Sequence, residues 1–179
     1  MPNDDEIRKE FDRLRKTDKG AALAYLANAY QLDHRGACSL SVETYDESRK
    51  KHAKTKGGKG ESTEAISVRI NEPYFDHQVE SDGGYRKLIH TLGHELQHVG
   101  QRSEDGWRNA TEKAEREFLA YSWELVEAPG KSIPPLTGKR REKAVRRVRK
   151  QFGAMSEDAK RRVADRIAAL EQQSISLAE

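Results

Sequence analysis

The sequence has few of the residues that would indicate a disulfide-rich, membrane-spanning or proline-rich protein. Its 179 residues include one cysteine and five prolines, and 7% are aromatic. Cys38 alone cannot form an internal disulfide, which excludes a disulfide framework. No run of about 18 apolar residues exists, which excludes a transmembrane helix. The acidic start, Met-Pro-Asn-Asp-Asp-Glu, does not resemble a signal peptide. We therefore expect any export to use a signal-peptide-independent route, and the chain could be one domain of a longer protein.

Composition predicts a folded domain with highly charged surfaces. Hydrophobic and charged residues each make up 35% of the chain, and the formal net charge is only +3. The length predicts one domain over residues 1–179, large enough to bury a core. Such a small net charge does not by itself indicate a nucleic-acid partner. Basic residues nevertheless gather in two segments, 49–59 and 139–150.

The spacing of apolar residues predicts a mainly helical α+β fold. Alternation with a period of two predicts strands over 37–45 and 64–71, the second ending at Asn71-Glu-Pro73. A turn is expected at 81–84, and the Lys- and Gly-rich segment 48–62 is expected to be a mobile hairpin connection or surface loop. Helical spacing predicts helices over 4–16, 21–31, 85–100, 110–127, 139–152 and 157–172.

One stretch carries a recognisable chemical pattern, His94-Glu95-Leu-Gln-His98. Residues four apart lie on the same face of a helix, so both imidazoles can reach one metal ion. Glu95 can then reach a water on that metal and act as a general base, as in zinc hydrolases. The alternative without a metal is a surface helix that happens to carry two histidines. The flanking residues favour the metal, because a polar triplet in an apolar setting needs a firm partner. These flanks are Leu88, Ile89, Leu92, Leu96 and Val99.

A catalytic zinc takes three protein ligands and leaves a fourth position for water. Glu117 is the first candidate for the third ligand. We expect it on the inward face of the 110–127 helix, where the small Ala120 allows close approach. The rival is Glu142, the only acid in 139–150, which we place on the apolar stripe of that helix with Val148. The sequence leaves both candidates open, and the other acids of the 110–127 helix are interpreted as solvated charges.

Other residues near the pattern have weaker interpretations. His90 lies four residues before His94, but about 12 Å along the helix axis from His98, so the two cannot share one zinc. We interpret His90 as a packing residue or as one that supports a ligand. Tyr121 and Tyr85 are candidates to polarise a carbonyl oxygen.

The run from His90 to His98, followed by Glu117-x-x-Ala120-Tyr121, resembles the compact zinc metallopeptidases of the glutamate-zincin type. Among these it looks most like bacterial toxin domains, such as the metallopeptidase tails of type VI secretion VgrG spike effectors. The resemblance implies a zincin-like fold, with a small sheet beside the metal helix, and a Zn²⁺ cofactor. It also implies a zinc-dependent endopeptidase that is secreted as an effector and acts in a target cell.

The same resemblance implies a protein or peptide substrate, and an immunity protein or a secretion spike as a partner. Zincins commonly align the peptide along a sheet edge beside the metal helix. We expect the strand at 65–70 to be that edge, with backbone-to-backbone pairing.

Two other functions stay open. A nucleic-acid-binding domain could use the segments 49–59 and 139–150 to neutralise phosphates. It is not favoured, because the basic helix lacks interleaved aromatics and acids elsewhere nearly balance the charge. A zinc amidase that acts on cell-wall peptide would use the same chemistry as the endopeptidase. Metal content separates the two zinc enzymes from the nucleic-acid-binding domain.

Overall fold

The computed structural model describes residues 3–32, 38–47, 52–57, 65–103, 112–131 and 133–177. These residues form a mainly helical α+β structure with a small sheet, as the sequence predicts, and the sheet has three described strands. The chain divides into two compact units, Met1–Ser103 and Glu104–Glu179, and each is described by itself. The single domain expected over residues 1–179 stays a prediction. No described helix is long and apolar enough to cross a membrane.

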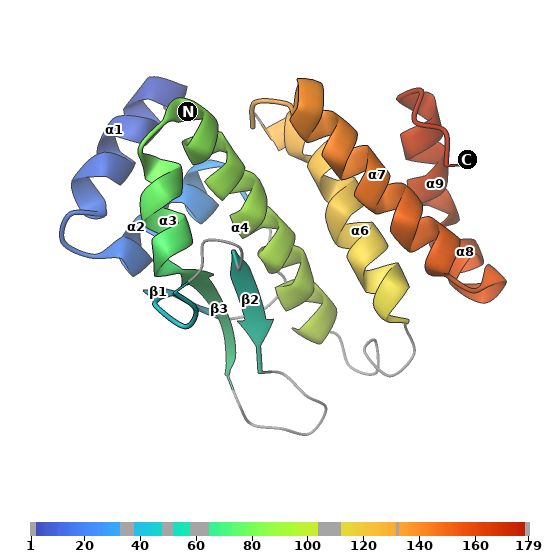
Figure 1. Ribbon diagram of the computed structural model, residues 1–179, viewed down its shortest axis with the longest axis horizontal. Coiled ribbons are helices and arrows are strands. Elements are labelled where there is room, and N and C mark those ends of the chain that lie inside the picture. Colours follow the sequence, from blue (N-terminus) through green and yellow to red (C-terminus); the bar gives the residue numbers. More distant parts are fainter. Residues whose placement is uncertain are drawn as a thin grey trace. The chain divides into compact units, whose positions relative to one another are not determined.

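Unit 1 combines four helices with the sheet (Figure 1). Its first two helices begin at side-chain caps that satisfy backbone donors of the first turn. Asn3 and Glu6 form a reciprocal capping box, and Asp18 accepts from the Ala21 backbone N–H at 2.9 Å. The elements are α1 (Asp4–Leu14), α2 (Lys19–Ala29), β1 (Cys38–Glu43), β2 (Ala53–Lys56), β3 (Ile66–Asn71), α3 (Glu72–Val79) and α4 (Asp82–Ser103).

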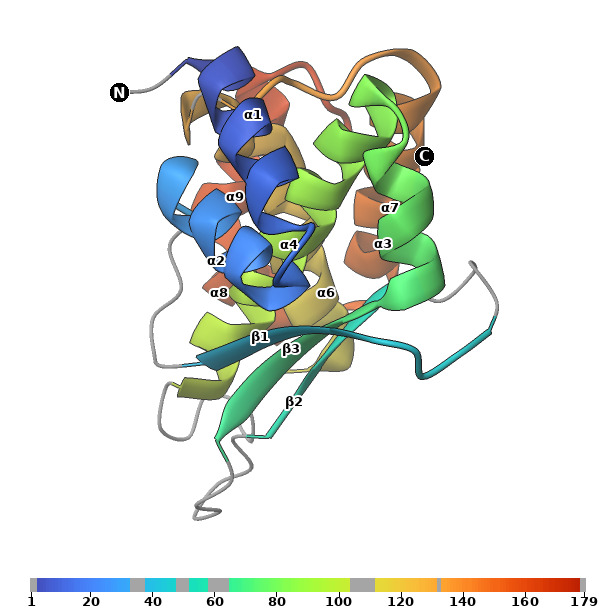
Figure 2. The ribbon, with the colours of Figure 1, turned by 90° about the vertical axis from the view of Figure 1, so that its left-hand side faces the viewer.

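The strand order of the sheet is β1-β3-β2. β1 runs parallel to β3, and β2 runs antiparallel to it. Alternate side chains of β3 are buried, namely those of Ile66, Val68 and Ile70. The helices of unit 1 lie on one side of the sheet (Figure 2). The expectation that strand 65–70 forms a sheet edge is wrong, because β3 has a neighbour on each side. β2 is an edge of the described sheet.

The segment expected to be a loop, 48–62, contains strand β2. Its residues 48–51 and 58–62 lie outside the described part of the chain. Directly after β2, Gly57 adopts a φ of +83°, and a Cβ there would lie 2.4 Å from the Ala65 carbonyl oxygen. Only glycine accepts this conformation and this close approach without strain. Gly57 therefore allows the end of β2 to lie close to Ala65, the residue before β3.

Two differences concern the chain before the histidines. The sequence predicts no helix after Pro73, yet α3 begins at Glu72 and contains this proline. Proline is tolerated in the first turn of a helix, because its missing N–H has no partner there anyway. The turn expected at 81–84 is instead the start of α4. A Cβ at Gly84 would lie 2.2 Å from the Gln78 carbonyl oxygen, so glycine permits the tight connection from α3 to α4.

Unit 2 is helical in its described part, with α6 and α7 packed against each other. Its elements are α6 (Lys113–Val126), η1 (Ala128–Lys131), α7 (Gly138–Ala154), α8 (Glu157–Arg162) and α9 (Ala164–Gln172). The core cluster consists of Phe118, Leu125, Ala144, Val148, Met155, Ala159, Val163, Leu170, Ile175 and Leu177.

Ser156 caps α8, but the helix expected over 157–172 divides at Val163 into α8 and α9. The start expected for α6 at residue 110 lies outside the described residues. Glu112 instead accepts a hydrogen bond from the Ser156 backbone N–H at 3.1 Å. Hydrogen bonds from Ser156 lower the pKa of Glu112. Glu112 thereby ties the start of α6 to the start of α8.

Candidate metal centre

Helix α4 places the two histidines of the pattern on one face, as their spacing predicts. The ring centroids of His94 and His98 are 5.0 Å apart, and the ring planes are inclined at 86°. Both side chains are half-buried. The predicted apolar flanks of the helix are all fully buried: Leu88, Ile89, Leu92, Leu96 and Val99. Packing of this apolar face holds the histidine face of α4 in place.

Gln101 determines which nitrogen of His98 is available as a ligand. The Nδ1 of His98 lies 2.7 Å from Oε1 of Gln101, and Gln101 itself is buried. An amide oxygen only accepts, so the contact assigns the proton to Nδ1. The lone pair is then on Nε2, the nitrogen that a metal ion would use. Metal-binding histidines commonly donate their other N–H in this way, which fixes the ring and raises its basicity.

Glu95 is buried, with 9% of its surface exposed, and it is held by a residue of the sheet. The hydroxyl of Thr55, on β2, donates to Oε2 of Glu95 at 2.7 Å. The same hydroxyl oxygen lies 3.1 Å from the Glu95 backbone carbonyl. One carboxylate oxygen is thereby anchored, and Oε1 is left to take a proton. This arrangement suits a general base whose position is fixed before substrate binds.

Arg102, one turn beyond His98, attaches the edge strand to α4. Its two terminal nitrogens donate to the backbone carbonyls of Gly57 at 2.6 Å and Thr55 at 3.0 Å. The carbonyl of His52 accepts from the Asn71 N–H, so it faces β3. Carbonyls of successive residues point to opposite edges of a strand. Those of Thr55 and Gly57, three and five residues after His52, therefore point away from β3. Arg102 therefore fills part of the free edge beside Glu95.

Tyr45 is a residue of this region that the sequence analysis missed. Burial, and then the negative charges of Glu95 and Asp46, raise the pKa of Tyr45 to about 12. The phenol is therefore protonated at neutral pH. Its hydroxyl oxygen is buried and makes no hydrogen bond to any residue that the structure describes. Lys54 lies over its ring, 3.4 Å from the centroid. A buried phenolic donor thus lies within electrostatic reach of Glu95.

The other predicted aromatic candidates have different surroundings. Tyr85 is buried against Phe11, with a ring-centroid distance of 5.3 Å, and Arg8 lies over its ring. Burial raises the pKa of Tyr85 to about 12, and its hydroxyl makes no hydrogen bond to any residue that the structure describes. Tyr85 therefore belongs to the core of unit 1. Tyr121 belongs to α6 of unit 2, where Arg147 lies 5.1 Å from its ring centroid.

The remaining histidine, His90, is buried one helical turn before His94, with 3% of its surface exposed. Its burial is consistent with its interpretation as a packing or supporting residue.

The predicted carboxylates lie in unit 2. Glu117 is half-buried on α6. Glu142 is exposed on α7, so its predicted place on the apolar stripe is wrong. At 100° per residue, Glu142 lies about 200° around the helix from the buried Ala144.

Glu115 was interpreted as a solvated charge, and this is also wrong. It is 2% exposed and forms a two-point ion pair with Arg162, at 3.1 Å and 2.7 Å. The pair joins α6 to α8 within unit 2.

The sequence offered little sign of Thr55 or Tyr45. Thr55 lies among lysines in a segment without apolar alternation. Tyr45 is the last residue of the predicted strand 37–45, where no pattern marks it as functional. The one available signal for Thr55 was a β-branched residue two positions before the Gly57-Gly58 pair of the sequence. No family model matches the chain, and no curated protein or solved structure is significantly similar to it.

Proposed function

We propose that this protein is a zinc-dependent endopeptidase in which Glu95 is the general base. The observation that carries the proposal is the placement of Glu95. It is buried in the same helical turn as His94, and Thr55 holds one of its oxygens at 2.7 Å. A structural carboxylate would be expected to pair with a cation, whereas this one accepts from a neutral hydroxyl and keeps one oxygen for a proton.

The donor set fits zinc. Two imidazoles one helical turn apart, one with its tautomer assigned by Gln101, are ligands that zinc prefers. A bound zinc would supply Lewis acidity and lower the pKa of a coordinated water. The chain's own part is to orient the histidines, to receive the water's proton at Oε1 of Glu95 and to pass it to the leaving amine.

Glu117 is the proposed third ligand. Its spacing from the histidines and the small Ala120 beside it in the sequence support this part of the proposal, and in the structure Glu117 is half-buried on α6. The exposed Glu142 is the weaker alternative.

Tyr45 has a proposed role at the carbonyl oxygen of the substrate. That oxygen becomes negative when water attacks, and a preorganised donor stabilises the developing charge. The Tyr45 hydroxyl is protonated at neutral pH, buried and near Glu95. In this role it takes the place that the sequence analysis gave to Tyr121 and Tyr85.

The free edge of β2 is the proposed guide for the peptide. An extended peptide can add to an exposed edge by backbone hydrogen bonds. Arg102 already holds the outward carbonyls of Thr55 and Gly57. The peptide therefore pairs toward the Ala53 end of β2. In this proposal β2 takes the role that the sequence analysis gave to the strand 65–70.

A zinc amidase that acts on cell-wall peptide is the alternative within the same chemistry. Secretion as an effector, an immunity protein and a spike partner rest on the resemblance of the His90–His98 and Glu117–Tyr121 segments alone. We retain them as parts of the proposal.

The test is metal content together with hydrolysis. The purified full chain should contain about one zinc per molecule and should cleave a fluorescent casein or an unstructured protein. A chelator should abolish cleavage, and added zinc should restore it. His94→Ala should lose both zinc and cleavage.

Two outcomes decide against the endopeptidase. A chain that binds zinc and cleaves purified peptidoglycan, but no protein, is the amidase. A chain that retains no zinc after dialysis against micromolar zinc is not a zinc enzyme of either kind.

A further inference from the structure

Four cations form a line along the solvent-facing side of α7. They are Lys139, Lys143, Arg146 and Lys150, and all four are exposed. Steps of four, three and four residues keep them on one side of a helix. At 1.5 Å rise per residue the line is about 16 Å long, with a cation roughly every 5 Å. We call these four residues the α7 cation row.

The α7 cation row has no acidic partners among the described residues. The neighbouring Arg149 differs, because its Nε donates to the Ser176 carbonyl at 2.8 Å. Glu142 is the one acid in the helix. The positive charge of the row is therefore not paired with an acid in the described part of unit 2.

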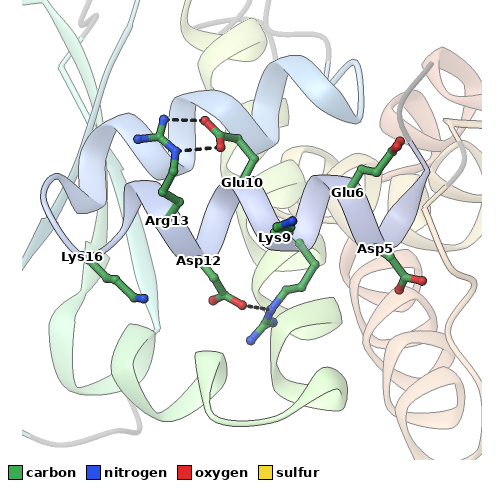
Figure 3. Close-up of a pocket in the computed structure, with 8 residues that line it drawn as sticks. Asp5, Glu6, Lys9, Glu10, Asp12, Arg13 and Lys16 are labelled. Carbon is green, nitrogen blue, oxygen red and sulfur yellow. Dashed lines mark hydrogen bonds and ion pairs between the residues drawn. The ribbon is translucent and has the colours of Figure 1, made fainter.

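Helix α1 shows the contrasting arrangement (Figure 3). Its surface also carries several cations, but Arg13 contacts Glu10 at 2.6 Å, and Arg8 contacts Asp12 at 2.8 Å. Charges of both signs alternate there, as on an ordinary solvated helix. The α7 cation row is thus more than a general consequence of a charged composition.

The row suits a regularly spaced polyanion. One strand of a nucleic acid duplex presents a phosphate about every 3.4 Å of helix axis. About five phosphates therefore face a row of this length. Lysine and arginine contacts of this kind supply affinity without sequence preference.

Membranes and acidic proteins fit less well. A helix that binds a membrane inserts its apolar face into the lipid. The apolar face of α7 is instead buried in unit 2, through Ala144 and Val148. The core of a protein interface is depleted of charge and enriched in apolar and aromatic groups. The apolar neighbours of the α7 cation row, such as Val145 and Phe152, are instead partly buried against the core cluster of unit 2.

We infer that the α7 cation row binds the phosphodiester backbone of a nucleic acid. The inference is independent of the zinc chemistry proposed for α4. It revises the expectation that a nucleic-acid partner is not favoured, because that expectation rested on overall charge and on the lack of aromatics. Neither bears on backbone binding by a local row of unpaired cations.

The test measures fluorescence anisotropy of two labelled 20-base-pair DNA duplexes of unrelated sequence with the full chain. Both should bind with similar affinity. The plot of log K against log salt should have a slope of about −3.6 if four phosphates are neutralised. Removing zinc with a chelator should not change the affinity. The double variant Lys143→Glu/Arg146→Glu should weaken binding at least tenfold at 50 mM salt.

A matched variant keeps the test specific. Arg13→Glu/Lys16→Glu on α1 changes net charge by the same amount and should bind the duplexes within about twofold of the parent. Equal weakening by both double variants would mean that only net charge matters, and the inference would be wrong. It would also be wrong if a poly-glutamate peptide, or vesicles with anionic lipid, competed as well as unlabelled duplex at equal charge.

Discussion

The hydroxyl of Thr55 lies 2.7 Å from Oε2 of Glu95, across 40 positions of the sequence. This contact joins the edge strand β2 to the turn of α4 that carries both histidines. It gives the carboxylate a fixed orientation. The sheet therefore contributes one residue, Thr55, to the candidate metal centre.

The first prediction concerns Glu95 itself. Glu95→Gln should keep zinc and fold but lose at least about 10²-fold in kcat, because an amide cannot take a proton from water. Zinc content and steady-state hydrolysis check this. If the variant loses zinc as readily as His94→Ala does, Glu95 is a ligand and the assigned role is wrong.

The second prediction concerns Thr55. Thr55→Val keeps the shape of the side chain and removes the donated hydrogen bond. We expect kcat to fall about 10- to 100-fold, because the carboxylate loses its fixed position, while KM and zinc content hardly change. Thr55→Ser should recover most of the activity, because the hydroxyl is restored. A serine variant as slow as the valine variant would show that packing of the methyl group matters, and not the hydrogen bond.

The third prediction concerns Tyr45. Tyr45→Phe should lower kcat about 10²-fold without changing zinc affinity, because one donor to the developing oxyanion is lost. Tyr85→Phe is the matched control. It should leave kcat unchanged and should not lower the free energy of unfolding, because the buried Tyr85 hydroxyl has no hydrogen-bond partner among the described residues. The role assigned to Tyr45 fails if the two variants have the same kinetics.

The fourth prediction concerns the third ligand. Glu117→Ala should weaken zinc binding by orders of magnitude, and Glu142→Ala should leave it unchanged. Gln101→Ala provides the scale for a supporting residue, with an expected loss of about 10- to 100-fold. Zinc titration against a competing chelator at fixed pH measures all three. A normal Glu117→Ala together with a defective Glu142→Ala would place the third ligand on α7.

The fifth prediction concerns stability of unit 2. Glu115→Gln should lower the free energy of unfolding by about 1 to 3 kcal/mol, because the buried Glu115 loses its charge and with it the ion pair to the exposed Arg162. Glu157→Gln removes an exposed ion pair with Lys160 and should have no measurable effect. Urea denaturation monitored by circular dichroism tests both. Equal effects would mean that Glu115 behaves as a surface charge.

Local spacing was enough to predict the histidine face of α4 and its buried flank. His94 and His98 are four residues apart, and apolar residues at helical spacing bury the opposite side. The sequence could not reveal Thr55, because its contact with Glu95 depends on the pairing of β2 with β3. The segment around Thr55 is polar and looks like a loop.

The error at Glu142 has a different cause. The larger apolar residues of α7, Val145, Val148 and Phe152, point to a buried face about 50° around the helix from the one that the structure shows, and closer to Glu142. The structure centres the buried face on Ala144 and Val148, and Glu142 then lies on the exposed side. Small alanines carry little weight in a hydrophobic pattern, although they mark where helices pack closely.

The hold of Arg102 on Thr55 and Gly57 also bears on solubility. An unprotected strand edge is a template on which a second chain can add and start a fibril. With two of its outward carbonyls already bound to a guanidinium, β2 offers such a chain an interrupted ladder. The same two contacts leave the Ala53 end of β2, where we propose that the substrate pairs, and they oppose self-association of folded molecules.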